Sequence, residues 1–152
     1  MEEHYNHQPY ARLAGMTVLS FAAMYILMYA MVDAASSVFN NINQFYMAGL
    51  MAMPMGVIEL ALMGRMYPSA TTNRILMAVG VIAMVVFFLL IRQQVAVTDK
   101  QFLRSMIPHH SGAILMCAKA PIQSSEIKEL CRSIIASQDA EIRQMKALLA
   151  KQ

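Results

Sequence analysis

Groups that can bind a soft metal ion are concentrated in the stretch 106–117. Its sequence, MIPHHSGAILMC, contains two thioethers, two adjacent imidazoles and one thiol. These side chains suit monovalent copper or silver. The whole chain also has 16 Met among its 152 residues. The residue types therefore predict a site for Cu(I) or Ag(I).

Helical spacing would place these groups on one side. On a helix of 3.6 residues per turn they occupy an arc of about 120°. The residues on this arc are Met106, His109, His110, Met116 and Cys117. Pro108 removes a backbone donor and clashes with the carbonyl one turn earlier, so we expect the helix to bend just before the histidines. Such a bend would open the ligand positions toward a partner helix.

A second helical stretch carries groups that can face the first. Gln138, Glu141 and Met145 share one of its faces. Glu141 can orient a ligating His through its second ring nitrogen, and Met145 can bind a metal directly. We therefore place Met145 among the candidate ligands. Gln138 and Glu141 are candidates for polar residues that contact and orient those ligands.

The two stretches predict an antiparallel hairpin over residues 98–151, because their connection is only a few residues long. Thr98 is expected to cap the first helix, with Gln101 completing a capping box. Pro121 ends that helix, and a serine at 124 or 125 caps the next. A lone hairpin buries little surface, so we expect it to pack on a second copy, on another protein or on membrane helices.

Each candidate ligand also has a structural interpretation. Met often fills buried helix faces, and a single His often serves as a hydrogen-bonding group. Two adjacent His side chains point about 100° apart on a helix, so they seldom bind one ion. Cys117 is a metal ligand, a small apolar residue, or the partner of Cys131 in a disulfide. If the two cysteines pair, neither sulfur is a thiolate ligand.

The remainder of the chain is apolar: 58% of all residues are hydrophobic and 14% are charged. Three stretches lack Lys and Arg and approach the length that crosses a hydrocarbon core: 13–32, 45–64 and 75–91. We predict an all-α protein with three transmembrane helices within 13–92, followed by the extramembrane hairpin, a ferritin-like half-bundle. Residues 1–12 are predicted to form a polar leader, which contains His4 and His7.

The distribution of basic residues predicts the orientation. Arg12 precedes the first predicted span, and Arg65 and Arg74 flank the connection between the second and third. The connection between the first two spans, 33–44, has no Lys or Arg. Because basic residues favour the cytoplasmic side, we expect a cytoplasmic N-terminus and an external hairpin. In a bacterial inner membrane the hairpin would be periplasmic.

Methionines also line the first two predicted spans. The two faces consist of Met24, Met28 and Met31, and of Met51, Met55, Glu59 and Met63. Glu59 lies deep in an apolar stretch, where an acid is a functional candidate. These faces form either a path for metal ions or protons, or adaptable packing between helices. In the packing interpretation Glu59 is hydrogen-bonded to Tyr25, Tyr29 or another polar group.

Two motifs in the hairpin resemble a known family. They read Asp99-x-x-Phe102-Leu103-x-x-Met106-x-Pro108-His109-His110-x-x-Ala113-Ile114-x-Met116 and Ile134-x-x-x-Gln138-x-x-Glu141-Ile142-x-x-Met145. Over about residues 98–150 the chain resembles the family catalogued as domain of unknown function 305, which is similar to ferritin-like helical proteins. The resemblance implies periplasmic or secreted binding of copper or silver. It favours five ligands: Met106, His109, His110, Met116 and Met145.

The resemblance also bears on assembly. Family members with two hairpins can close a four-helix bundle alone, whereas this chain has one, which implies a homodimer or a higher oligomer. Cys117 stands where the family more often has Ala, and Gln138 and Glu141 are further motif members.

These observations predict a non-enzymatic, membrane-anchored protein that buffers Cu(I) or Ag(I) or hands it to a delivery partner. The alternatives are a structural membrane module in which Met only packs, and a subunit of a metal transporter. A di-iron oxidase would need Glu-x-x-His pairs, which the sequence lacks. Nucleic acid is not an expected partner, because no basic run with interleaved aromatic residues occurs.

Overall fold

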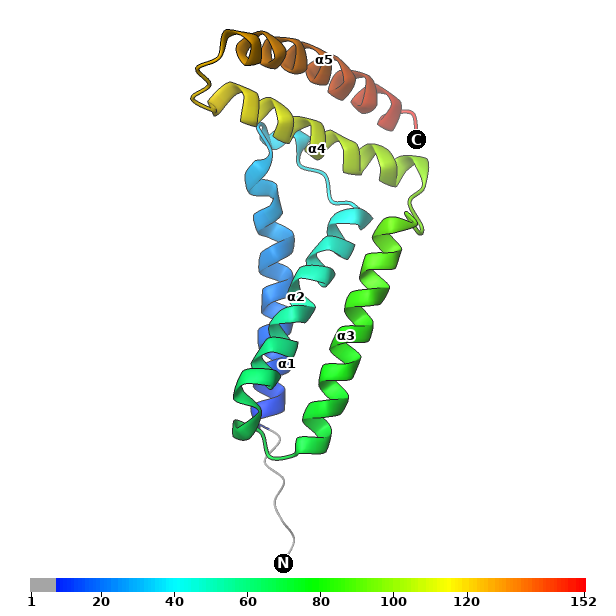
Figure 1. Cartoon of the computed structure of the whole chain (residues 1–152). Helices are drawn as coiled ribbons and strands as arrows, with labels where there is room; N and C mark the ends of the chain where they lie inside the picture. The colour runs from blue at the N-terminus through cyan, green and yellow to red at the C-terminus, as the bar shows by residue number, and fades with distance from the viewer. Residues whose placement is uncertain (1–7) are drawn as a thin grey trace, which may run out of the picture. The chain divides into compact units, whose positions relative to one another are not determined.

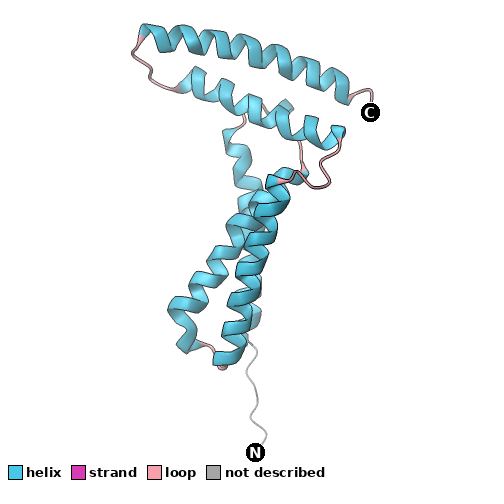
Figure 2. Ribbon diagram, turned by 45° about the vertical axis from the view of Figure 1, so that its right-hand side comes forward, coloured by secondary structure: helices cyan, strands magenta, loops and turns pink. Residues whose placement is uncertain are grey.

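The computed structural model describes residues 8–152, and over this range the chain is all-α, without strands (Figures 1 and 2). The α-helices are α1 (Gln8–Leu27), α2 (Ile42–Met63), α3 (Ala70–Arg92), α4 (Asp99–Lys119) and α5 (Ser125–Leu149). Three short 3-10 helices accompany them: η1 (Met28–Met31), η2 (Ala35–Ser37) and η3 (Gly64–Met66). His4 and His7 lie outside the described residues.

The chain divides into two compact units. The first contains α1, most of α2 and α3, up to Val95. The second contains Met28–Gln44 together with Ala96–Gln152. The hairpin of α4 and α5 is therefore not alone in its unit, because the connection that follows α1 packs with it.

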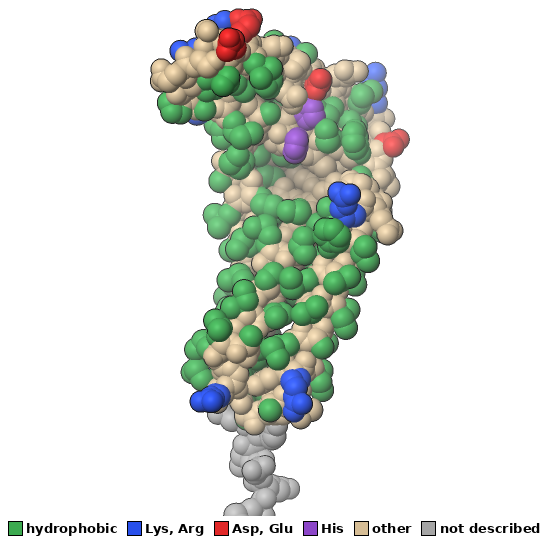
Figure 3. All heavy atoms as spheres, in the orientation of Figure 1, with side chains coloured by type: hydrophobic (Ala, Val, Ile, Leu, Met, Phe, Trp, Pro, Cys, Tyr) green, Lys and Arg blue, Asp and Glu red, His purple; other side chains and the backbone are tan. Residues whose placement is uncertain are grey.

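The first unit consists of helices whose apolar side chains face outward. Three helical stretches are long and apolar enough to cross a membrane: Gln8–Met31, Ile42–Met66 and Ala70–Arg92. Hydrophobic side chains cover most of the visible face of these helices (Figure 3). The helices approach closely at small residues: a Cβ added to Gly80 would lie 2.6 Å from Val57. Small residues of this kind permit tight helix packing within a bilayer.

The first helix differs from its predicted extent. Its α-helix begins at Gln8, within the stretch predicted as a polar leader, and ends at Leu27, before the end of the predicted span 13–32. The chain then tightens into η1, where the Tyr29 hydroxyl donates to the Phe39 carbonyl at 2.9 Å. Met28 and Met31 therefore do not continue the α-helical face of Met24, because this segment turns to make contacts in the second unit.

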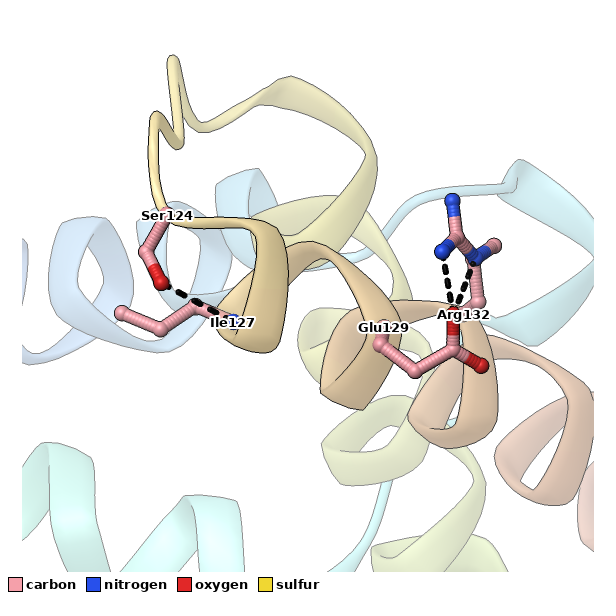
Figure 4. Close-up of polar contacts among 4 residues, drawn as sticks. All are labelled: Ser124, Ile127, Glu129 and Arg132. Carbon is pink, nitrogen blue, oxygen red and sulfur yellow. Dashed lines mark hydrogen bonds and ion pairs between the residues drawn. The ribbon is translucent and has the colours of Figure 1, made fainter.

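Local signals set the ends of the hairpin helices. The Thr98 side chain accepts from the backbone N–H of Gln101, and the Ser124 side chain accepts from that of Ile127 (Figure 4). Both contacts satisfy N–H groups that the first helical turn leaves unpaired. The predicted capping box is only half formed, because the Gln101 side chain accepts instead from the Ile42 N–H at 3.0 Å. The second helix of the hairpin, α5, ends at Leu149, two residues before its predicted end at Lys151.

A small apolar core holds the two hairpin helices together. Its buried residues are Leu103, Ile107, Ile142 and Met145. Partly buried side chains pack around them: Phe39, Met106, Ile114 and Leu149. Phe39 comes from the connection after α1, so this segment contributes apolar surface to the hairpin.

The connection is also held to α4 by hydrogen bonds. The Asp33 N–H donates to the Ser111 hydroxyl at 2.9 Å, and the Ser105 hydroxyl donates to Asn41 at 3.1 Å. Ser111 and Asn41 are buried, where unpaired polar groups would be costly. The surface that we expected to pack on another chain or on membrane helices is thus partly covered by residues 28–44 of the same chain.

Candidate metal-binding hairpin

His110 lies inside the hairpin and uses both of its ring nitrogens. Its side chain is buried, with 8% exposure. Nδ1 lies 2.9 Å from the Met106 carbonyl oxygen, and Nε2 lies 2.7 Å from a carboxylate oxygen of Glu141. We expected Glu141 to orient the ring and leave its other nitrogen for a metal. The main-chain carbonyl of Met106 occupies that nitrogen instead.

These two contacts limit what His110 can do. A neutral imidazole has one donor and one acceptor, whereas here each nitrogen faces an oxygen. The pair is therefore satisfied when the ring is protonated, or when the Glu141 carboxyl carries the proton. In either state neither nitrogen of His110 presents a lone pair to a metal ion. Binding through His110 would require one contact to break.

The two methionines nearest His110 belong to the apolar core. Met145 is buried within the cluster of Leu103, Ile107 and Ile142, and Met106 packs against that cluster. Both side chains thus have the packing role described for Met in protein interiors. Gln138 is half-buried on α5, less than one turn before Glu141.

The other two candidate ligands lie on an exposed face of α4. The His109 side chain is exposed, and within residues 8–152 its ring has no hydrogen-bond partner. The ring centroids of His109 and His110 are 6.1 Å apart, and the two ring planes are inclined by 65°. Met116 is 54% exposed. Seven residues correspond to nearly two full turns, so His109 and Met116 share one face of the helix.

Cys117 and Cys131 form a disulfide across the turn between α4 and α5, with their Cα atoms 5.2 Å apart. Of the three interpretations of Cys117, the structure therefore shows the paired one. The paired sulfurs do not act as thiolate ligands. The bond joins the last turn of α4 to the second turn of α5 and closes the hairpin.

Across the described range 8–152, no three His, Cys, Asp or Glu side chains are grouped as a metal site would require. Thioethers and imidazole together suit Cu(I) and Ag(I) rather than the harder divalent ions.

In the first unit Glu59 is hydrogen-bonded to a residue outside the predicted spans. The Tyr67 hydroxyl donates to the Glu59 carboxylate. Two causes raise the pKa of Tyr67 to about 12: burial is the larger, and the hydrogen bond to Glu59 comes next. Tyr67 is thus one of the other polar groups that the packing interpretation allowed as a partner of Glu59, besides Tyr25 and Tyr29.

Tyr67 is part of a polar cluster at one end of the first unit. Its ring lies 5.3 Å from that of Tyr10, whose hydroxyl donates to Asn73 at 2.9 Å. Asn73 in turn donates to the Gly64 carbonyl at 2.9 Å. Helical periodicity could not reveal this cluster, because its members come from three helices and a connection. The only signal was a lone acid within an apolar stretch.

The methionines proposed to line a membrane path are largely on the surface of the first unit. Met24 is half-buried, and three others are exposed: Met51, Met55 and Met63. Met28 and Met31 belong to the second unit.

Comparisons with known proteins extend over most of the chain. A family described as Domain of unknown function (DUF305) matches residues 58–149. An uncharacterized protein of Acanthamoeba polyphaga mimivirus is 34% identical over 137 residues, an alignment that covers 88% of this chain and 88% of the relative. No solved structure matches. The family match includes all of α4 and α5, and it begins after Met31.

Proposed function

This chain belongs to the family described as Domain of unknown function (DUF305), and from that premise we propose that its hairpin binds Cu(I) or Ag(I). The observation that carries the proposal is the imidazole of His109. It is exposed, it lacks a hydrogen-bond partner among residues 8–152, and it shares a helix face with the exposed thioether of Met116. The second histidine of the pair, His110, orders the hairpin.

The first unit anchors the hairpin to a membrane. The outward-facing apolar side chains of α1, α2 and α3 support this role, since an apolar surface of this extent needs a lipid environment. Residues 28–44 pack with the hairpin in one compact unit. Residues 33–44 lack Lys and Arg and are therefore predicted to be external, so the packing of this connection with the hairpin supports an external hairpin. In a bacterium this side is the periplasm.

The protein would act without catalysis, as a buffer or donor of metal. Exposed ligands allow a metal ion to pass to a partner protein, whereas a buried site would retain it. The exposed apolar side chains Ile127 and Leu130 on α5 support a homodimer, in which a second hairpin would cover them.

Retention of Ag(I) by the purified full chain tests the proposal. Ag(I) needs no added reductant, so the Cys117–Cys131 disulfide stays intact during equilibrium dialysis in detergent. We expect stoichiometric retention, and a loss of affinity of at least about tenfold in His109→Ala. Lys119→Ala, on the same helix, is the matched control and should bind normally. Binding should weaken in acid, because a ligating imidazole must be neutral.

A structural membrane module is the second candidate, and the burial of Met106 and Met145 in the apolar core favours it. In that case the methionines serve packing alone. The wild-type chain would then retain no Ag(I), and His109→Ala would change neither stability nor metal content.

A further inference from the structure

We propose that Met31, from the turn that follows α1, is a ligand of the same metal ion as His109 and Met116. This site rests on the proposed function, and it deepens that function by naming a ligand from outside the hairpin. Met31 also lies outside residues 58–149, the part of the chain that the family match covers.

The η1 turn lies directly against α4 at Gly112. A Cβ added to Gly112 would be 3.2 Å from the Met31 carbonyl oxygen and 4.0 Å from the Met31 Cβ. The neighbouring contact from Asp33 N–H to Ser111 holds the turn at this place. Gly112 is therefore a position where a side chain on α4 would press tightly against the turn. Its missing side chain allows the Met31 backbone to reach the helix.

Gly112 lies between the two exposed ligands. It follows His109 by three residues and precedes Met116 by four, spacings that put all three on one face of α4. Residues at these spacings have Cβ atoms about 5–6 Å apart. The Cβ of Met31 thus starts within about 10 Å of the Cβ atoms of both His109 and Met116. Two long, unbranched thioethers and one imidazole can converge across that distance.

Solvent exposure separates this group from the other candidates. Met31 is 51% exposed and Met116 is 54% exposed. Their side chains can therefore turn toward a metal ion without opening the apolar core. Met145 belongs to the buried core of Ile107 and Ile142, and Met106 packs against that core, so binding through either would disturb it.

The chemistry of the three groups selects the metal. Two thioethers and a neutral imidazole carry no charge, so they do not balance a divalent ion. They suit a soft monovalent ion with three ligands. The ligand set therefore favours Cu(I) and Ag(I) over Zn(II), whose structural sites usually contain thiolate or several imidazoles.

Methyl NMR of the full chain in detergent, labelled at the Met methyl carbons, tests the site directly. On titration with Ag(I), the methyl signals of Met31 and Met116 should shift. Those of Met106 and Met145 should stay in place. Single Met→Leu variants assign the signals and leave side-chain volume nearly unchanged.

Affinity for Ag(I) gives the second readout. Met31→Leu should weaken Ag(I) binding at least about tenfold. Replacing a residue that only orients the ligands already costs about that much, and loss of a ligand should cost no less. Met66→Leu is the matched control, since Met66 is also exposed but belongs to the first unit. It should bind as the wild type does.

The outcomes separate this inference from the proposed function. If the wild type binds Ag(I) but Met31→Leu binds equally well and the Met31 signal does not move, Met31 is not a ligand and the hairpin function stands. If the wild type retains no Ag(I), both are wrong. Thermal unfolding of Met31→Leu guards against misfolding, and unchanged affinity in a folded variant overturns the inference.

Discussion

The two units of the chain bury opposite kinds of surface. In the unit of α1, α2 and α3, large apolar side chains face outward, and Leu62 is 80% exposed. In the hairpin unit Ile107 is completely buried, and the outer face of α5 carries ion pairs such as Glu129–Arg132 (Figure 4). The exposed apolar surface of the first unit is the kind that a lipid bilayer would cover, whereas the second unit buries apolar side chains and exposes charged ones, as proteins in water do.

Methionine shows the same difference. In the first unit Met51, Met55 and Met63 are exposed, where adaptable apolar side chains suit lipid or helix contacts. In the hairpin unit Met145 belongs to the core, whereas Met116 is exposed to solvent. The exposed thioether lies outside the packed core, so it can reach a metal ion without disturbing that core.

The largest predicted effect concerns the core of the hairpin. Ile107→Ala should lower the free energy of unfolding by about 2–5 kcal/mol, since it leaves a cavity in a fully buried place. Leu148→Ala, a comparable truncation at an exposed position on α5, should cost much less. Denaturant unfolding in detergent measures both. Equal losses would contradict the conclusion that Ile107 lies in a packed apolar core and contributes more to stability than an exposed side chain.

The disulfide should come next in size. Cys117→Ser together with Cys131→Ser removes a cross-link with a sequence separation of 14, worth about 3 kcal/mol for a loop of this length. Protease resistance of the hairpin should fall, while α1–α3 stay protected by detergent. If both units lose protection together, they do not unfold as separate units.

A smaller effect is expected from the ion pair of His110 and Glu141. Glu141→Gln should lower the free energy of unfolding by about 1 kcal/mol. This is less than the loss expected for a buried hydrogen bond between charged groups, because the Glu141 side chain is 50% exposed. The control is Glu129→Gln, whose partner Arg132 lies on the surface. We expect no measurable change in the control. A result with the reverse order would show that His110 does not order the hairpin.

The last effect has no influence at neutral pH and appears only in base. Burial and the bond to Glu59 raise the pKa of Tyr67 to about 12, so folding favours its neutral phenol. The stabilisation is complete below pH 10, the ordinary value for Tyr, and is lost as the pH rises through 12. Ultraviolet titration of wild type and Tyr67→Phe isolates this group. Ionisation of Tyr67 near pH 10 would show that the bond is absent in detergent.

Local pattern predicted much of the architecture. The three apolar stretches, the Thr98 cap and the helical hairpin all depend on neighbouring residues, and the structure confirms them. The first span stays helical to Met31, close to its predicted end, but its α-helix stops at Leu27, where the chain turns to contacts with α4, far along the sequence. The capping box failed for the same reason, since the Ile42 N–H competes for the Gln101 side chain.

The candidate site divides in a similar way. Residue types and the helical period already identified His109 and Met116 as neighbours on one face. They could not tell which histidine of the pair is free, because that depends on the Glu141 carboxylate from a second helix. Residue types and helical period also could not show that Met31, predicted to lie on a membrane face, instead lies against α4.

By itself, the sequence determined the helices, their caps, the apolar spans and the soft ligands available, because each follows from interactions within a few residues along the chain. Only the tertiary structure decided which ligands are occupied and which are open. The Asp33–Ser111 contact joins residues 78 positions apart and brings η1 to Gly112. Contacts at that separation depend on how complete helices and connections pack, and no local periodicity encodes them.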